Sequence, residues 1–373
     1  MTDIMVKAYV GQKGKQGDLG LEFECEGRDP LPMPHNATWT THEEGSLRGF
    51  GMEYVTNGPI NMDQVYKEVE GLVKHVKKEA RVLEDSPRTS WHIHKNVGFY
   101  VPNQLHTAIC AYWLLEPILM KYCGPDRERN MYCLQLKHAE GVAMAVKEDY
   151  HKKRPFAELL NDQIRYGGQN VNAIPKYCSL EYRGMRGTYD PDVVYTWANV
   201  INTVHERSKG YANPQVLMDR FFIMTPEQFV DSLLPEDFIK KHVYPLPNWK
   251  DLLDENMGVV SGLAYYHDWD AWQYSRAEYF KKNPVKEKKT KIPTFDDVLA
   301  ARQTVLRNDI PTGTITVMDD PWAPTPAPQG IPTITATTFH ALSEAGQAGV
   351  LGNGQVEWYD VANRRWIVGR VHG

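Results

Sequence analysis

The chain has 373 residues, a length that predicts one large domain with room for a small additional one. Its hydrophobic fraction of 42% and charged fraction of 24% are those of an ordinary soluble globular protein and exclude the disordered and fibrous classes. The net charge of −5 provides no overall positive field for binding DNA or an anionic membrane.

The five cysteines form no Cys-x-x-Cys pair and are odd in number, which argues against a disulfide framework and against a thiolate zinc site. The first ten residues lack the charged start and apolar run of a secretion signal, and no window is apolar enough to span a bilayer. We therefore expect a cytoplasmic protein without a membrane partner.

Alternating segments and helical segments follow one another along the first two hundred residues. Residues 21–26, 90–100 and 177–183 alternate between polar and apolar side chains, which predicts three strands with one polar face each. Apolar residues recur at helical spacing over 62–83, and the apolar run 105–123 predicts a buried helix that ends at Gly124. A further helix is predicted to start at Asp190-Pro191.

The C-terminal third differs in composition. Residues 214–310 are mostly of helical character, with prolines between the helices and a lysine-rich stretch at 281–291 that predicts a solvated loop. We expect a main domain over 1–310, a proline-rich linker over 311–332 and a small tail over 333–373, in which 355–359 and 365–371 form a β-hairpin. So small a tail is expected to dock on the main domain or on a protein partner.

The polar faces of the first two strands carry residues that can bind cations. Glu22 and Glu24 project from one face of their strand, and two carboxylates so close together favour a cation. His92 and His94 share one face of the next strand, where imidazoles can ligate a metal or donate to phosphate. Each pattern alone is also typical of a half-exposed strand with a polar face.

Glu181 and Arg183 share a face of the third strand. They could simply neutralise each other. Alternatively, Glu181 completes an oxygen-rich cation site while the Arg183 guanidinium holds phosphate through two parallel hydrogen bonds. The three pairs together predict one magnesium and nucleotide site.

Other polar residues surround these strands in the sequence. Glu53 follows the flexible Gly49 and Gly51 on a strand-like run, and Arg127 and Arg129 lie in a polar loop after the buried helix. Asn172 comes shortly before the Glu181 strand. Each of these alone is more typical of a structural role.

In their order, these residues resemble the amidoligase family, which belongs to the glutamine synthetase-like carboxylate-amine ligases. The resemblance spans roughly residues 18–204. The matching motifs are Leu21-Glu22-Phe23-Glu24, Gly45-Ser46-Leu47, Gly51-Met52-Glu53, His92-Ile93-His94, Arg129-Asn130-Met131-Tyr132-Cys133, and Asn172 with Glu181-Tyr182-Arg183. Glu44 stands where the family usually has Asp, and we assign it no role.

The resemblance implies an α+β fold with a glutamine synthetase-like antiparallel sheet flanked by helices, to which the tail adds a small C-terminal β extension. It implies ATP and two Mg²⁺ ions as cofactors, with Mn²⁺ as a substitute. The implied metal ligands are Glu22, His92 and Glu181 for the ion nearer the phosphates, and Glu24 and Glu53 for the other. The implied nucleotide-binding residues are His94, Arg183, Arg127 and Asn172, and the implied catalytic residues are Arg183, Glu53 and Arg129.

The implied activity is ATP-dependent joining of a small-molecule or peptide carboxylate to an amine, through an acyl phosphate. Two alternatives remain open at this stage. A carboxylate and histidine cluster also suits a metal-dependent hydrolase. Because related proteins occur in phages, the chain could instead be a phage structural or assembly protein that keeps the fold, acting in the host cytoplasm.

Overall fold

The computed structural model divides the chain into two compact units, Met1–Lys282 and Asn283–Gly373. It describes residues 5–83, 86–150, 152, 155–156, 159 and 164–269 of the first unit, and residues 333–335, 348–350, 356–360 and 365–372 of the second. The predicted linker at 311–332 and the lysine-rich stretch at 281–291 lie outside the described residues.

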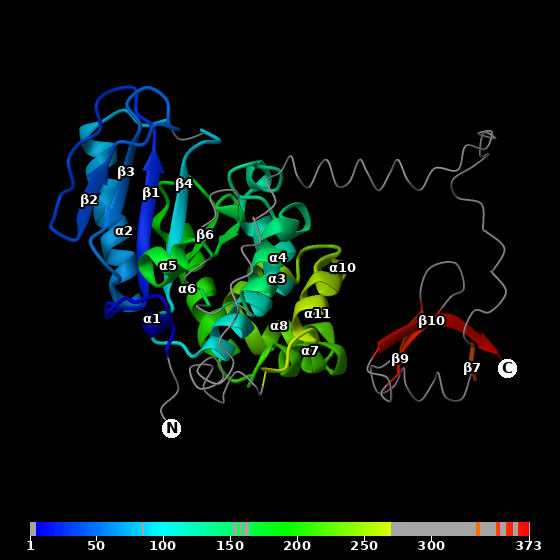
Figure 1. The fold of residues 1–373 in the computed structure, drawn as a ribbon. Coiled ribbons are helices and arrows are strands. Elements are labelled where there is room, and N and C mark those ends of the chain that lie inside the picture. Colours follow the sequence, from blue (N-terminus) through cyan, green and yellow to red (C-terminus); the bar gives the residue numbers. More distant parts are fainter. Residues whose placement is uncertain are drawn as a thin grey trace, which may run out of the picture. The chain divides into compact units, whose positions relative to one another are not determined.

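The first unit contains a six-stranded antiparallel sheet with flanking helices (Figure 1), so the predicted α+β class is confirmed at this level. Its spatial order is β2-β3-β1-β4-β6-β5. The strands are β1 (Leu19–Cys25), β2 (Trp39–His42), β3 (Met52–Thr56), β4 (Ser90–Asn96), β5 (Gln169–Asn170) and β6 (Ser179–Arg186).

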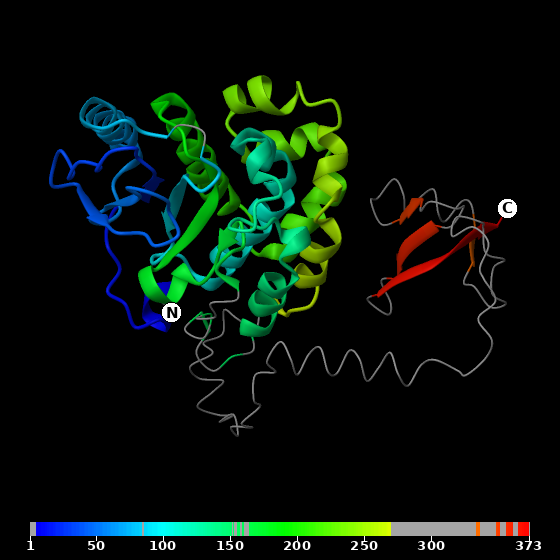
Figure 2. The ribbon, with the colours of Figure 1, turned by 90° about the horizontal axis from the view of Figure 1, so that it is seen from above.

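Helices flank this sheet. The α-helices are α1 (Val6–Tyr9), α2 (Met62–Glu79), α3 (Pro102–Cys123), α4 (Glu140–Asp149), α5 (Ala173–Tyr177), α6 (Pro191–Ser208), α7 (Pro214–Ile223), α8 (Pro226–Leu233), α9 (Glu236–Phe238), α10 (Trp249–Asp254) and α11 (Met257–Ala264). Shorter turns are η1 (Pro125–Arg127), η2 (Leu136–His138) and η4 (Ile239–Val243). Figure 2 shows α2 and α6 side by side over one face of the sheet.

Three long helices, α2, α3 and α6, form where the sequence predicts them, for local reasons. In α2 the apolar residues at helical spacing, from Val65 to Val76, are buried. Helix α6 begins at Pro191, and the Asp190 side chain caps it by accepting a hydrogen bond from the Asp192 backbone N–H at 2.9 Å. Helix α3 is buried on nearly all sides and ends at Gly124, whose φ of 112° requires glycine.

The apolar faces of the strands form the core beneath the sheet. The rings of Phe23 on β1 and Trp91 on β4 stack with centroids 4.2 Å apart, and both side chains are fully buried. Their neighbours in sequence therefore face the opposite side of the sheet. This alternation leaves one face of β1 and β4 for polar side chains.

Two predicted strand boundaries are wrong. Strand β4 ends at Asn96 rather than at residue 100, because the Asn96 side chain donates to the backbone carbonyls of Lys15 and Gly17 and turns the chain. Strand β6 begins at Ser179 because Tyr177 ends α5 and Cys178 has a left-handed φ of 56°.

The second unit contains a four-stranded sheet in the order β7-β10-β9-β8. Strands β9 (Val356–Asp360) and β10 (Arg365–His372) pair antiparallel at the predicted hairpin. Strand β7 (Thr333–Thr335) pairs parallel with β10, and β8 (Ala348–Val350) pairs antiparallel with β9. The C-terminal sheet is thus larger than a single hairpin.

Candidate functional site

Register across the sheet brings the predicted polar residues together. In the pairing of β1 with β4, Glu22 lies directly opposite His92. In the pairing of β4 with β6, His94 lies opposite Glu181, and across β1 and β3 Glu24 lies opposite Glu53. Directly opposed residues have neighbouring side chains on the same face.

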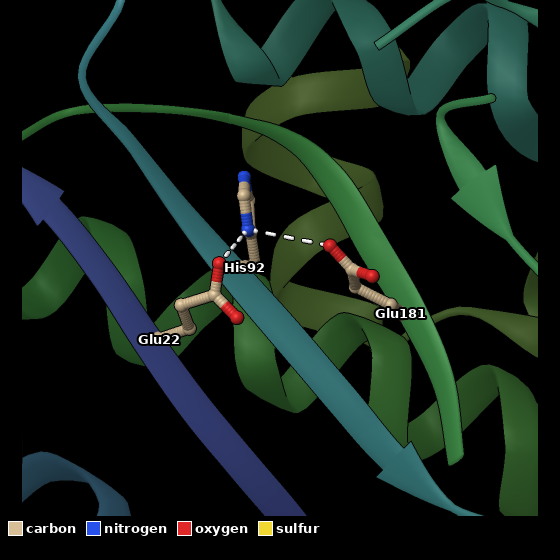
Figure 3. Close-up of side chains that lie close together, drawn as sticks. All are labelled: Glu22, His92 and Glu181. Atoms are coloured by element: carbon tan, nitrogen blue, oxygen red, sulfur yellow. Dashed lines mark hydrogen bonds and ion pairs between the residues drawn. The ribbon is translucent and has the colours of Figure 1, made fainter. Parts of the chain in front are cut away.

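Glu22, His92 and Glu181 form the centre of this group (Figure 3). The Nδ1 atom of His92 lies 2.5 Å from Oε1 of Glu22 and 3.3 Å from Oε1 of Glu181. One ligand atom from each residue lies within 4.8 Å of the others, and His92 is 0% exposed. Two carboxylates so close in a buried place require a compensating positive charge. Their oxygens and the imidazole nitrogen are a donor set that suits a divalent cation.

Ser90 links the centre to Glu24. Its hydroxyl donates to Oε2 of Glu24 and lies 2.9 Å from Nε2 of His92. The same His92 nitrogen is 3.5 Å from Oε2 of Glu24. His92 therefore connects three of the acidic residues, with Glu22 and Glu181 at one ring nitrogen and Glu24 at the other.

His94 lies at the other end of the group. Its Nε2 is 3.2 Å from Oε2 of Glu22, and its Nδ1 is 3.1 Å from the hydroxyl of Ser179. The ring of Tyr177 on α5 meets the His94 ring edge to face, with centroids 6.1 Å apart. Tyr177 is 70% exposed, so this end of the site opens to solvent beside an aromatic ring.

Glu181 is held by residues of two neighbouring strands. Arg183 on β6 donates from Nη1 to Oε1 of Glu181, and Asn170 on β5 donates from Nδ2 to Oε2 at 2.6 Å. The Nε of Arg183 donates to the Tyr132 carbonyl at 3.1 Å. The ion pair between Glu181 and Arg183 is thus present, and Glu181 still reaches His92.

A β-bulge in β6 sets the direction of Arg183. Trp91 pairs with Met185 and Ile93 with Tyr182, so Arg183 and Gly184 together oppose the single residue His92. Arg127 supports the bulge by donating from Nε to the Gly184 carbonyl at 3.1 Å and from Nη2 to the Arg183 carbonyl at 2.6 Å. The extra residue lets Met185 stay on the core face while Arg183 stays on the polar face.

The charges of the centre shift the pKa values of its members. Burial alone raises the pKa of Glu22, but the charge and hydrogen bond of His92 outweigh it and hold the pKa well below its usual value. Burial also raises the pKa of Glu181, but the charges of Arg183 and His94 outweigh this effect and lower the pKa overall. Burial lowers the pKa of His94, yet its hydrogen bond to Glu22 and the charge of Glu181 raise it overall.

Glu53 behaves in the opposite way. Burial, followed by the charge and hydrogen bond of Glu22 and the charge of Glu24, raises its pKa to about 9. Without a cation, Glu53 therefore carries a proton at neutral pH, and a cation bound here would release that proton.

Comparison with known protein families gives one match, over the segment that forms most of this sheet. Residues 35–207 match the family model described as "Putative amidoligase enzyme". This segment belongs to the amidoligase family. A search of curated proteins found none that matches the chain. Among the described residues, no helix has both the length and the apolar character to cross a membrane.

The amidoligase segment contains most of the site but not all of it. Glu53, His92 and Glu181 lie within the matched residues, whereas Glu22 and Glu24 precede them. Strand β1, which carries both of these glutamates, lies between β3 and β4 in the sheet. The structure thus places residues from outside the matched segment at the centre of the amidoligase sheet.

Three other predicted residues lie around the centre rather than in it. Arg129 is exposed, and within the described residues no hydrogen bond joins it to the cluster. Asn172 is buried, and its backbone N–H donates to Oδ1 of Asn170 at 2.9 Å, so it supports a neighbour of Glu181. The Nε and Nη2 of Arg127 bind backbone carbonyls of the bulge, and its nucleotide-binding role stays a prediction.

Three residues that contact the cluster were not among the site residues predicted from the sequence. Ser90 could have been found, because it continues the period of two formed by His92 and His94. Asn170 lies on a strand of only two residues, Gln169–Asn170, too short to give a periodic signal. Tyr177 was predicted to be the first residue of a strand, and its contact with His94 depends on the short helix α5.

Proposed function

We propose that the chain is an ATP-dependent carboxylate-amine ligase of the glutamine synthetase-like type. The observation that carries this proposal is the buried cluster of Glu22, His92 and Glu181 in a sheet that belongs largely to the amidoligase segment. Such a ligase needs a site for divalent cations, and the donor set of this cluster suits one. The match to the amidoligase family supports amide-bond formation as the reaction.

The donor set fits Mg²⁺. Glu22, His92 and Glu181, whose ligand atoms lie within 4.8 Å of one another, would hold one ion. Glu24 and Glu53, which lie opposite each other on β1 and β3, would hold a second. When bound, the ions would offset negative charge on the ATP phosphates and on the phosphoryl group during transfer. The raised pKa of Glu53 fits this role, because a cation would take the place of its proton.

The reaction would proceed in two steps. A carboxylate oxygen of the acid bonds to the γ-phosphorus of ATP as ADP leaves. The amine nitrogen then bonds to the acyl carbon as phosphate leaves and the nitrogen loses a proton.

The residues of the chain serve these steps mainly by position and charge. Arg183, fixed by Glu181 and the Tyr132 carbonyl, keeps further N–H groups for the transferred phosphoryl group. His94, whose raised pKa favours the imidazolium form, would donate to the nucleotide phosphates. Tyr177 lies beside His94, where its exposed ring could support the nucleotide base.

The test is incubation of the full chain with ATP, Mg²⁺ and pooled metabolites or peptides. Mass spectrometry should then find a product lighter than its two reactants by one water. The Glu181→Gln variant should lose amine-dependent ADP release by about 100-fold or more, because it removes a charge that the cation needs. Glu236→Gln is the matched control, since Glu236 is exposed and pairs with Lys240 on the surface.

Three outcomes would contradict the proposal. ADP release that is independent of any amine would identify a hydrolase instead. Absence of nucleotide binding with Mg²⁺ present would favour a structural protein. Full activity in a folded Glu181→Gln variant would remove the cluster from the reaction.

A further inference from the structure

A small cavity lies beside the cluster, at the end away from His94. Its volume is about 20 Å³, enough for a water molecule or one end of a small polar group. Its lining includes Glu24 and three arginines, Arg88, Arg127 and Arg183. Formal positive charge therefore exceeds negative charge in this cavity, whereas the neighbouring cluster is rich in carboxylates.

Two loops that carry motifs of the family resemblance contribute to the lining. Ser46 belongs to Gly45-Ser46-Leu47, and Tyr132 belongs to the motif that starts at Arg129. Arg88 donates from Nη1 to the Ser46 carbonyl at 2.6 Å, which joins its own loop to the first of these.

Asn130 connects the loop that carries Tyr132 to the loop that carries Arg88. Its Nδ2 donates to the Pro87 carbonyl at 3.1 Å, next to Arg88, and its Oδ1 accepts from the Tyr132 backbone N–H at 2.9 Å. The Tyr132 carbonyl in turn accepts from Arg183. Three loops and β6 thus converge on one cavity.

The loop that carries Ser46 is held in a defined shape. Oε1 of Glu44 accepts from the Ser46 backbone N–H at 3.0 Å, and Oε1 of Glu26 accepts from the Arg48 backbone N–H at 2.6 Å. Gly49 has a left-handed φ of 62°, which favours glycine. Glu44, which the sequence left without a role, therefore shapes this wall of the cavity.

We propose that this cavity receives a carboxylate of the acid substrate and that Arg88 is the residue that selects it. The inference rests on the proposed ligase function. A planar carboxylate matches a guanidinium through two parallel hydrogen bonds, and Arg88 has N–H groups beyond the one that binds Ser46. The cavity is too small for a triphosphate, but it adjoins Glu24 and Arg183, where the acid must meet the phosphoryl group.

The test measures binding rather than turnover, so it does not depend on a known substrate pair. The full chain is titrated with acetate, succinate and glutarate, and separately with inorganic phosphate, by calorimetry in a buffer of constant chloride. The same is done for Arg88→Gln and for the control Arg220→Gln, since Arg220 is exposed on α7, away from the cavity. Binding of Mg²⁺ with a non-hydrolysable ATP analogue is measured for all three proteins.

We expect at least one of the carboxylates to bind the wild-type chain and to bind Arg88→Gln at least about tenfold more weakly, the effect of one lost charge-assisted contact. Arg220→Gln should bind the carboxylate as the wild type does, and affinity for the ATP analogue should be equal in all three. Equal melting temperatures would show that Arg88 does not act through the fold.

The proposal is overturned if no carboxylate binds the wild type, or if Arg88→Gln binds it unchanged. It is also overturned if phosphate displaces the carboxylate and loses affinity equally in Arg88→Gln, because the cavity would then be a phosphate site. Failure of the ATP analogue to bind, with carboxylate binding intact, would instead count against the proposed ligase function.

Discussion

Glu116 is a buried carboxyl outside the site, in the middle of α3. Its Oε2 accepts from the Leu136 backbone N–H at 2.6 Å and from Nδ2 of Asn256 at 3.4 Å. Burial raises its pKa from 4.5 to about 7, although both hydrogen bonds act in the other direction. A single side chain thus joins α3 to the loop at η2 and to the residue that precedes α11.

This shift makes stability depend on pH. Between pH 4.5 and about 7 the folded chain holds a proton on Glu116 that the unfolded chain has lost, so the free energy of unfolding falls as pH rises. This stabilisation is fully present below the pKa that Glu116 has in the unfolded chain, and it is lost as pH rises through the pKa that Glu116 has in the folded chain. Glu116→Gln keeps an oxygen acceptor but cannot ionise. Its free energy of unfolding, relative to that of the wild type, should therefore rise by about 3 kcal/mol as pH increases across this range.

Urea unfolding at several pH values between about 5 and about 8 measures this difference. Glu236→Gln, at an exposed ion pair, should follow the wild type in parallel. A gap between Glu116→Gln and the wild type that stays constant with pH would show that Glu116 is not protonated in the fold.

The residues of the centre could be predicted from the sequence because strands have a period of two. That period places Glu22, His92 and Glu181 on polar faces without knowledge of the fold. Their contact distances could not be predicted, because these depend on register and on the bulge in β6. No sequence pattern pointed to Arg88, because the cavity that it lines is formed by three loops that meet only in the folded chain.

At the scale of elements, the junction of β4 and β6 is tightly packed. Gly187 follows β6, and its backbone N–H donates to the Thr89 carbonyl at 2.9 Å. A Cβ added at Gly187 would lie 2.0 Å from Oγ1 and 2.5 Å from Cβ of Thr89. Thr89 is buried between Arg88 and the first residue of β4, so the clash would displace the start of that strand.

Gly187→Ala should therefore lower the free energy of unfolding by about 1–3 kcal/mol, the usual cost of overpacking. Gly258→Ala is the matched control, because nothing lies within 4 Å of its added Cβ and it is inside α11. That variant should be neutral or more stable by up to about 1 kcal/mol. Equal stability of the two variants, measured by thermal unfolding, would contradict the packing argument.

The long elements of the fold could be predicted, and the short ones could not. Helices α2, α3 and α6 have caps and apolar patterns many residues long, so local physics specifies them. Strand β5 and helix α5 form only because tertiary contacts stabilise them, since segments so short have no independent stability. The end of β4 likewise depends on Asn96 binding carbonyls about eighty residues away in the chain.

At the scale of the whole molecule, the site and its supports belong to one unit. Every residue of the cluster, the bulge and the cavity lies within Met1–Lys282, and so does the hydrophobic core from Val6 to Trp269. A unit of this size buries most of the surface that its unfolded chain would expose and can fold independently. The C-terminal strands pair with one another in a separate sheet.

We therefore expect a chain that ends at Lys282 to fold cooperatively and to keep the Mg²⁺ and nucleotide binding proposed above. Its melting temperature should lie within a few degrees of the full chain, and its affinity for Mg²⁺ with a non-hydrolysable ATP analogue should agree within about twofold. Calorimetry on both chains tests this, with Glu181→Gln in the shortened chain as the control that loses binding. Aggregation of the shortened chain, or loss of its ligand affinity with the fold intact, would show that residues 283–373 contribute directly to the stability or binding of the first unit.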